Sequence, residues 1–319
     1  MPPHLLLVNL GTPEAATPAA VRTFLAEFLG DPAVVDLPRW LWLPILHGIV
    51  LRTRPRRVAK QYASIWTAEG SPLRASTERI VTELRSRAAG RFGVSSAYRY
   101  GEPSIDTAIR RIASKGSAAI VVVPLFPQRT DATTGTVFRC AREAATLQGL
   151  ADRLVERPID PADAGYVVAM AERWREATAG VSPPPEHLVL SFHGVPVRYD
   201  AREGHVYVRD CEATARALLG AIAWPEERST LAFQSKFGAE AWLKPATAEV
   251  LDALPRRGLR RVAVVTPGFV TDGLETVEEI GIRGRETFLA AGGTDLIRVE
   301  AVGAHEAFLD SLASLALSG

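Results

Sequence analysis

Short apolar runs recur along this chain and alternate with segments of helical periodicity. Most of these runs are apolar on both faces, which is typical of parallel strands that helices cover on both sides. The predicted strands are Leu5–Asn9, Ser95–Tyr100, Ala118–Pro124, His187–Ser191, Thr230–Phe233, Arg261–Thr266 and Asp295–Val299. This alternation predicts an α/β fold built on parallel sheets flanked by helices.

Helix signals lie between the predicted strands. Ser104 follows Pro103 and is a typical N-cap, and Gly292-Gly293 is a strong stop signal. Helices are predicted at 104–115, 134–147, 163–177, 211–223, 247–254, 274–291 and 306–317.

The chain has 319 residues, which is long enough for two domains of ordinary size. Two prolines and two aspartates around Ile159–Gly165 mark the best candidate for a boundary. We therefore predict two similar Rossmann-like halves, 1–160 and 161–305. The C-terminal helix at 306–319 is expected to join the first half.

Composition excludes several classes of protein. The 37 Lys and Arg residues balance 36 Asp and Glu residues, so no nucleic-acid partner is expected. Cys140 and Cys211 are the only cysteines, too few for a disulfide framework, a zinc knuckle or a four-cysteine cluster. The start has no basic region typical of a signal peptide, and the apolar stretch Trp40–Leu51 is shorter than the ~20 residues that span a bilayer. A cytoplasmic protein is expected.

Two predicted strands end in residues suited to chemistry. His193 stands in Ser191-Phe192-His193-Gly194-Val195-Pro196, directly after an apolar run, and the turn after Arg261–Thr266 leads to Glu275 at the start of a helix. Ligands of open α/β sheets bind at the carboxyl ends of strands. A His and a Glu there are suited to binding a metal, moving protons, or both.

These residues belong to motifs that resemble the ferrochelatase family, in order and spacing along almost the whole chain. The matching segments are Val8–Pro13, Phe24–Leu29, Gly70–Leu73, Tyr98–Gly101, Pro124–Gln128, Thr133–Gly135, Phe233–Gly238 with Trp242-Leu243, and Leu274–Thr276 with Glu278-Glu279. The resemblance implies two Rossmann-like halves with a porphyrin cleft between them.

The resemblance assigns His193 as the base or metal ligand and Glu275 as its partner across the cleft. Insertion of Fe²⁺ removes the pyrrole N–H protons, and imidazole is a proton acceptor near neutral pH. One nitrogen and one carboxylate also make a weak, exchangeable metal site. The structural alternatives are a capped strand-end histidine and a carboxylate stabilised by the helix dipole.

Further acids follow Glu275 on the predicted helix. Glu279 lies four residues on, so the two share a face of an α-helix and suggest an acidic path. Many relatives continue this row with another acid where this chain has Arg283. For Glu278, Arg283 and Arg285 we expect an ordinary solvated charged face, and for Glu279 both interpretations stay open.

Other positions carry over as the porphyrin-binding residues Leu10, Arg99, Tyr100, Phe126 and Thr130. Leu10 cannot ligate iron, which indicates the protoporphyrin branch of the family. Arg99 is suited to a propionate, the alternative being an ion pair with a nearby acid.

Two features near this set differ from other members. Relatives usually have Tyr where this chain has Arg129, and the partner of this extra cation is open between a propionate and an acid. Cluster-bearing members place a cysteine near Asp131 and three in a C-terminal extension. No iron–sulfur cluster is expected here.

Trp40 and Trp42 lie in the region that forms the lip of the cleft in the family, and the basic residues from Arg52 to Lys60 follow. An apolar lip beside cations suits peripheral contact with the inner face of a membrane. The alternative is a core helix followed by a solvated basic turn.

Together these features predict an enzyme that inserts Fe²⁺ into protoporphyrin IX to form protohaem, the last step of haem biosynthesis. The metal is a substrate, and no permanently bound cofactor is expected. Two alternatives stay open: a cobalt or nickel chelatase of another tetrapyrrole, and a non-catalytic haem or porphyrin carrier.

Overall fold

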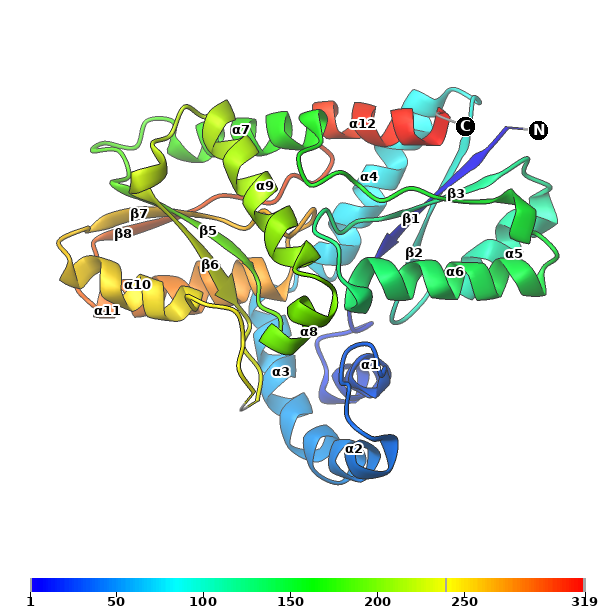
Figure 1. Cartoon of the computed structure of the whole chain (residues 1–319), viewed down its shortest axis with the longest axis horizontal. Coiled ribbons are helices and arrows are strands. Elements are labelled where there is room, and N and C mark those ends of the chain that lie inside the picture. Colours follow the sequence, from blue (N-terminus) through cyan, green and yellow to red (C-terminus); the bar gives the residue numbers. More distant parts are fainter. Residues whose placement is uncertain (1, 239, 318–319) are drawn as a thin grey trace. The chain divides into compact units, whose positions relative to one another are not determined.

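The computed structural model describes residues 2–238 and 240–317, and these form two compact units. Unit 1 comprises the chain up to Leu125, the segment Asp131–Pro158 and the chain from Leu312. Unit 2 comprises Phe126–Thr130 and Ile159–Ser311. Each unit holds one four-stranded parallel sheet flanked by helices (Figure 1), which confirms the predicted fold class.

The sheet of unit 1 has the strand order β2-β1-β3-β4. Its strands are β1 (His4–Asn9), β2 (Gly93–Tyr98), β3 (Ile120–Pro124) and β4 (Leu154–Glu156). Strand β3 is buried throughout, as its unbroken apolar run predicts. Strand β4 was not predicted, because its three residues are only half-buried and form no apolar run.

Several helices cover the sheet of unit 1. They are α1 (Pro18–Gly30), α2 (Arg39–Ile45), π-helix η1 (Leu46–Val50), α3 (Leu51–Ile65), α4 (Pro72–Ala88), α5 (Ile105–Lys115), π-helix η2 (Asp131–Gly135), α6 (Thr136–Leu147) and the 3-10 turn η3 (Ala151–Arg153). Helices α1 to α4 were not predicted. Prolines interrupt their pattern, although Pro18 and Pro72 occupy the first helical turn, where proline is tolerated.

Unit 2 repeats this plan with the strand order β6-β5-β7-β8. Its strands are β5 (His187–His193), β6 (Ser229–Gln234), β7 (Arg261–Val265) and β8 (Asp295–Arg298). Its helical elements are α7 (Ala164–Thr178), α8 (Val197–Arg202), α9 (Val206–Ala221), the 3-10 turn η4 (Glu226–Arg228), α10 (Thr247–Arg256), π-helix η5 (Leu274–Gly284), α11 (Arg285–Ala290) and α12 (Glu306–Leu317). Helix α12 starts in unit 2, and its residues from Leu312 belong to unit 1.

The first strands of the two sheets begin in the same way. His4 opens β1 and its Nε2 lies 2.9 Å from Ser95 Oγ on β2, while His187 opens β5 and its Nε2 lies 2.9 Å from Thr230 Oγ1 on β6. In both units the hydroxyl lies two residues beyond the register partner of the histidine. Counting from these histidines places Leu10 and His193 at equivalent positions.

One apolar core lies beneath the sheet of unit 2. Val189 and Val264 of the central strands pack there with Leu251 of α10 and Phe288 of α11, all at most 1% exposed. This burial holds the carboxyl ends of β5 and β7 in place. No helix in the described part of the chain is both long and apolar enough to cross a membrane.

Candidate active site

His193 is the last residue of β5, as the sequence predicts, and it pairs in register with Gln234 of β6. The next residue, Gly194, donates its N–H to the Gln234 carbonyl at 2.8 Å. A Cβ atom at position 194 would lie 2.7 Å from that carbonyl oxygen and 3.1 Å from the Trp242 ring. Only glycine lets the chain turn so close to β6.

The hydrogen bonds of His193 define its free ring nitrogen. Its Nδ1 lies 2.6 Å from the carbonyl oxygen of Gly194. Because a carbonyl only accepts hydrogen bonds, Nδ1 carries a proton. In the neutral ring Nε2 therefore keeps the lone pair that takes a proton or binds a metal.

Two aromatic residues surround the end of β5. Tyr207 of α9 donates a hydrogen bond of 2.6 Å from its hydroxyl to the His193 carbonyl. The ring of Phe269, in the turn after β7, has its centroid 6.3 Å from that of His193. Burial raises the pKa of Tyr207 well above its usual value, so its phenol stays protonated and donates this bond.

Glu275 lies in the first turn of η5, which is a π-helix rather than the predicted α-helix. Its main-chain carbonyl accepts a hydrogen bond of 2.7 Å from the Gln234 side-chain amide. At the preceding turn, Thr276 Oγ1 accepts from the Gly273 N–H at 3.0 Å and donates to Asp272 at 2.7 Å. Asp272 in turn binds Arg298 of β8. The start of η5 is thus tied to two strands of the sheet.

The charge of His193 acts on the Glu275 carboxyl. Burial raises the pKa of the Glu275 carboxyl above its usual value, and the positive charge of His193 opposes that rise. The negative charges of Glu279 and Glu278 raise the pKa of Glu275 further. A carboxyl in this setting binds and releases protons closer to neutral pH than a solvated one.

Glu279 is held by a residue just past the end of β6. Ser235 donates to its carboxylate twice, from the main-chain N–H at 2.8 Å and from the hydroxyl at 2.5 Å. Ser235 adopts a left-handed conformation with φ of 65° to do so. Glu279 is therefore an ordered acid and not part of a solvated face.

The expectation of a solvated face is wrong for Glu278. This residue is 5% exposed, and Arg283 donates from Nε to both of its carboxylate oxygens at 2.9 and 3.0 Å. The reason is the π-helix, whose i to i+5 bonds widen each turn, so that residues five apart, such as Glu278 and Arg283, also lie near one face. Arg283 therefore pairs with Glu278 and does not continue the row of Glu275 and Glu279.

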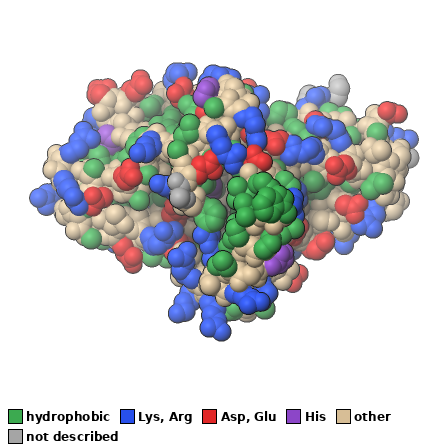
Figure 2. Space-filling view, turned by 60° about the horizontal axis from the view of Figure 1, so that its bottom comes forward, with side chains coloured by type: hydrophobic (Ala, Val, Ile, Leu, Met, Phe, Trp, Pro, Cys, Tyr) green, Lys and Arg blue, Asp and Glu red, His purple; other side chains and the backbone are tan. Residues whose placement is uncertain are grey.

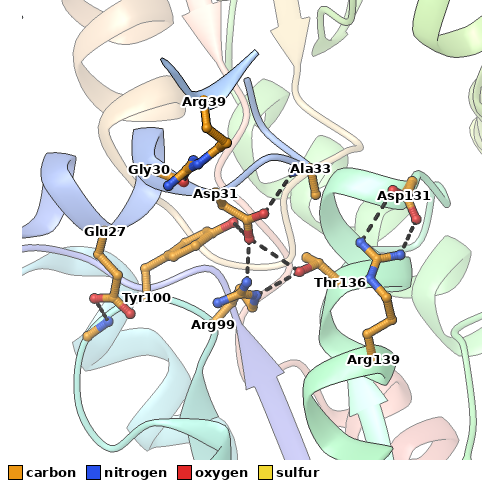
Figure 3. A network of polar contacts seen from close by, with 11 residues as sticks. Glu27, Gly30, Asp31, Ala33, Arg39, Arg99, Tyr100, Asp131, Thr136 and Arg139 are labelled. Atoms are coloured by element: carbon orange, nitrogen blue, oxygen red, sulfur yellow. Dashed lines mark hydrogen bonds and ion pairs between the residues drawn. The ribbon is translucent and has the colours of Figure 1, made fainter. Parts of the chain in front are cut away.

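In unit 1, Arg99 and Tyr100 converge on Asp31 (Figure 3). Arg99 forms an ion pair with Asp31 and donates from Nε to Thr136 Oγ1 at 2.8 Å. The hydroxyl of buried Tyr100 donates to the same Asp31 oxygen at 2.9 Å. The acid partner that the sequence left open for Arg99 is thus Asp31, which the sequence did not single out.

Leu10 follows β1 and is held through its backbone. Its N–H donates to Asn9 Oδ1 at 2.8 Å, and its carbonyl accepts from the Tyr100 N–H at 2.9 Å. At Gly11, with φ of 111°, a Cβ atom would lie 1.8 Å from the Tyr100 carbonyl oxygen. Glycine is required there so that the Leu10 loop can lie against the chain after β2.

Phe126 and Thr130 belong to unit 2, with His193, Glu275 and Glu279, whereas Leu10, Arg99 and Tyr100 belong to unit 1. Between Phe126 and Thr130, Arg129 binds Asp210 of α9. Across residues 2–238 and 240–317, no group of three or more His, Cys, Asp and Glu side chains could hold a metal ion. The two-residue set of His193 and Glu275 remains the candidate for transient metal contact.

Comparisons with known proteins agree on one family. A family model described as ferrochelatase matches residues 4–318. The chain is 40% identical to a ferrochelatase of Vibrio atlanticus over 98% of this chain and 96% of that protein. It is 44% identical to a ferrochelatase of Bordetella pertussis over 98% of this chain and 86% of that protein.

Solved structures agree on the fold. The sirohydrochlorin chelatase SirB of Bacillus subtilis subspecies spizizenii, in complex with cobalt, has a TM-score of 0.58 at 15% identity over 99% of this chain and 94% of that chain. CbiX, described as the terminal enzyme of sirohaem biosynthesis in denitrifying bacteria, has a TM-score of 0.52 at 17% identity over 99% of each chain.

Proposed function

This chain belongs to the ferrochelatase family and inserts iron into a porphyrin in haem biosynthesis, and we propose that the porphyrin is protoporphyrin IX and that His193 removes its N–H protons. The observation that carries the proposal is the contact of 2.6 Å between His193 Nδ1 and the Gly194 carbonyl oxygen. The Nδ1 proton is committed to the Gly194 carbonyl, so Nε2 is the free base at the end of β5.

Glu275 is proposed as the second member of the site. Its raised pKa suits a group that receives a proton from the imidazolium or passes one to solvent. One imidazole nitrogen and one carboxylate also bind Fe²⁺ without enclosing it, so the metal can leave for the porphyrin nitrogens. Glu279 follows Glu275 on η5 and accepts two hydrogen bonds from Ser235. We propose that it extends this acidic path.

For the porphyrin, we propose Leu10, Phe126 and Thr130 as direct contacts. The Leu10 side chain is apolar and has no atom that coordinates iron. It therefore favours a porphyrin whose metal receives no protein ligand from this position. Arg99 and Tyr100 are both bonded to Asp31, and we propose that they shape the loop after β2. A propionate that binds Arg99 has to share it with Asp31.

We further propose a cytoplasmic protein with peripheral membrane contact. Trp40 is 79% exposed and Ile49 59% exposed, values that are high for large apolar side chains. Trp42 is buried and donates from its indole to the Leu29 carbonyl, so the expectation of an exposed lip is wrong for this tryptophan. Figure 2 shows hydrophobic side chains gathered over the α2 region and cationic ones over α3. Such a pair of surfaces suits an anionic bilayer, from which a hydrophobic porphyrin can be taken.

The test is anaerobic turnover with Fe²⁺ and either protoporphyrin IX or coproporphyrin III, followed by absorbance. Multiple turnovers with protoporphyrin, lost in His193→Ala while porphyrin binding is retained, are expected. Turnover with coproporphyrin alone would contradict the choice of porphyrin. Insertion by His193→Ala at the wild-type rate would remove His193 as the base.

A further inference from the structure

The segment Phe126–Thr130 belongs to unit 2, although the chain on both sides of it belongs to unit 1. Two consecutive side chains bind it to α9. Gln128 is 4% exposed, and its Nε2 donates to Thr214 Oγ1 at 2.8 Å and to the Pro267 carbonyl at 3.2 Å. Gln128 thus joins the segment both to α9 and to the turn after β7.

Arg129 forms the second attachment. Its main-chain N–H and its Nε donate to Asp210 Oδ2 at 3.0 and 2.9 Å, and its Nη2 donates to Oδ1 at 2.9 Å. The Asp210 side chain is 6% exposed, so the pair is a bidentate ion pair with a buried carboxylate. Asp210 is thus the acid partner that the sequence left open for Arg129.

A single face of α9 connects these attachments to His193. Tyr207, Asp210 and Thr214 are three and four residues apart, the spacing that places side chains on one side of an α-helix. Tyr207 binds the His193 carbonyl, Asp210 binds Arg129, and Thr214 binds Gln128. The helix therefore sets the distance between the segment and the end of β5.

The turn after β7 adds a second connection. The Pro267 carbonyl accepts from Gln128 and also from Tyr166 of α7, at 3.0 Å. Two residues further on, Phe269 stands beside the His193 ring. Loss of the Gln128 bond would free one side of this turn.

We propose that Gln128 and Arg129 are positioning residues for porphyrin binding. Acting through Thr214 and Asp210, they hold Phe126 and Thr130 at a fixed place relative to His193. The proposal rests on the proposed function, in which Phe126 and Thr130 contact the porphyrin. The competing role, direct binding of a propionate by Arg129, predicts a different result when Asp210 is changed.

The experiment compares Asp210→Asn, Arg129→Gln and the double variant of the full chain. The KM values for protoporphyrin IX and Fe²⁺ are measured together with porphyrin affinity by fluorescence quenching. Each single change is expected to raise the porphyrin KM by about tenfold and to leave the Fe²⁺ KM unchanged. The porphyrin KM of the double variant should be no higher than that of the more affected single variant, because both changes remove the same interaction.

Direct propionate binding gives the opposite pattern. Asp210→Asn would then leave the porphyrin KM unchanged or lower it, since the guanidinium is released toward the substrate, and that result overturns the proposal. Additive effects in the double variant also overturn it. Gln128→Leu should raise the porphyrin KM in the same way, and a wild-type KM there removes Gln128 from the proposal.

Controls separate positioning from general damage. Arg256→Gln removes the exposed ion pair with Asp252 on α10 and should change neither KM. Arg129→Lys keeps the charge and should recover part of the porphyrin affinity, which a folding defect would not show. If the wild-type protein fails to insert iron, the proposed function fails, while porphyrin affinity still decides between the two roles of Arg129.

Discussion

The side-chain amide of Gln234 donates a hydrogen bond of 2.7 Å to the main-chain carbonyl of Glu275. The amide is itself oriented by Ser191, which donates to its Oε1 at 2.7 Å. Since the Ser191 proton is used there, Thr247 is the donor across the 2.8 Å between the two hydroxyls. Each residue of this chain, from Thr247 of α10 to Gln234, thus donates to the next. The chain ends at the Glu275 carbonyl and fixes the start of η5 relative to the end of β5.

Replacing Gln234 by Leu is expected to lower kcat for iron insertion by about tenfold or more, because the start of η5 loses its attachment to β6. Porphyrin affinity should stay unchanged, since the amide acts on Glu275. The measurement is anaerobic turnover beside fluorescence titration. Gln148→Leu, at an exposed helix end in unit 1, is the control. An unchanged kcat in Gln234→Leu would show that η5 holds Glu275 by itself.

Gly194→Ala is expected to reduce kcat by about 100-fold, because the added methyl group forces the chain at His193 away from the Gln234 carbonyl. Gly220→Ala on α9 is the matched control. A Cβ atom there meets nothing within 4 Å, and alanine favours a helix. Steady-state kinetics of both variants decide the matter, and equal activities would contradict the close approach.

Much of the fold follows from local pattern. The apolar runs at β1, β3, β5 and β7 are buried on both faces, so they identify parallel strands without knowledge of their partners. Strand β4 lacks such a run, and prolines obscure the helices α1 to α4. The rule that ligands bind at strand ends singled out His193 and Glu275, which interact electrostatically in the structure, while their roles stay predictions.

The partners of the site residues could not be predicted in this way. Asp31 is 68 residues from Arg99, and Asp210 is 81 residues from Arg129, so no sequence spacing links them. The π-helix η5 is also invisible to a search for α-helical periodicity. It changes which residues align, and it buries Glu278 against Arg283 where a solvated face was expected.

The stability of the chain is expected to fall at mildly acidic pH through His4. Burial and the nearby Lys115 and Arg85 lower the pKa of His4 to about 4. The unfolded chain, with a histidine pKa of about 6.5, therefore binds more protons between these values. The contribution of neutral His4 to the free energy of unfolding is complete above pH 6.5 and is lost as the pH falls toward 4. At pH 5 the loss is about 2 kcal/mol.

Urea unfolding at pH 7.5 and pH 5 measures this loss. His4→Gln removes the titrating group and keeps an acceptor for Ser95, so its two unfolding free energies should differ by less than those of the wild-type protein. An equal difference in both proteins would mean that other groups cause the acid sensitivity. His187, whose pKa burial also lowers, adds a loss of the same sign.

Membrane contact is expected to depend on the exposed cations of α3. Changing Arg52 and Arg56 to Glu reverses two exposed charges on α3, the helix that follows Ile49. Each cation near an anionic bilayer contributes about 1 kcal/mol, so the double variant should bind phosphatidylserine-containing vesicles at least tenfold more weakly in sedimentation assays. Changing Arg110 and Arg111 on α5 to Glu alters the net charge equally and should have little effect.

Weaker vesicle binding by both double variants would indicate attraction by net charge alone. Unchanged binding of the α3 variant would place the contact elsewhere, and Trp40→Ser then tests whether the apolar surface alone suffices.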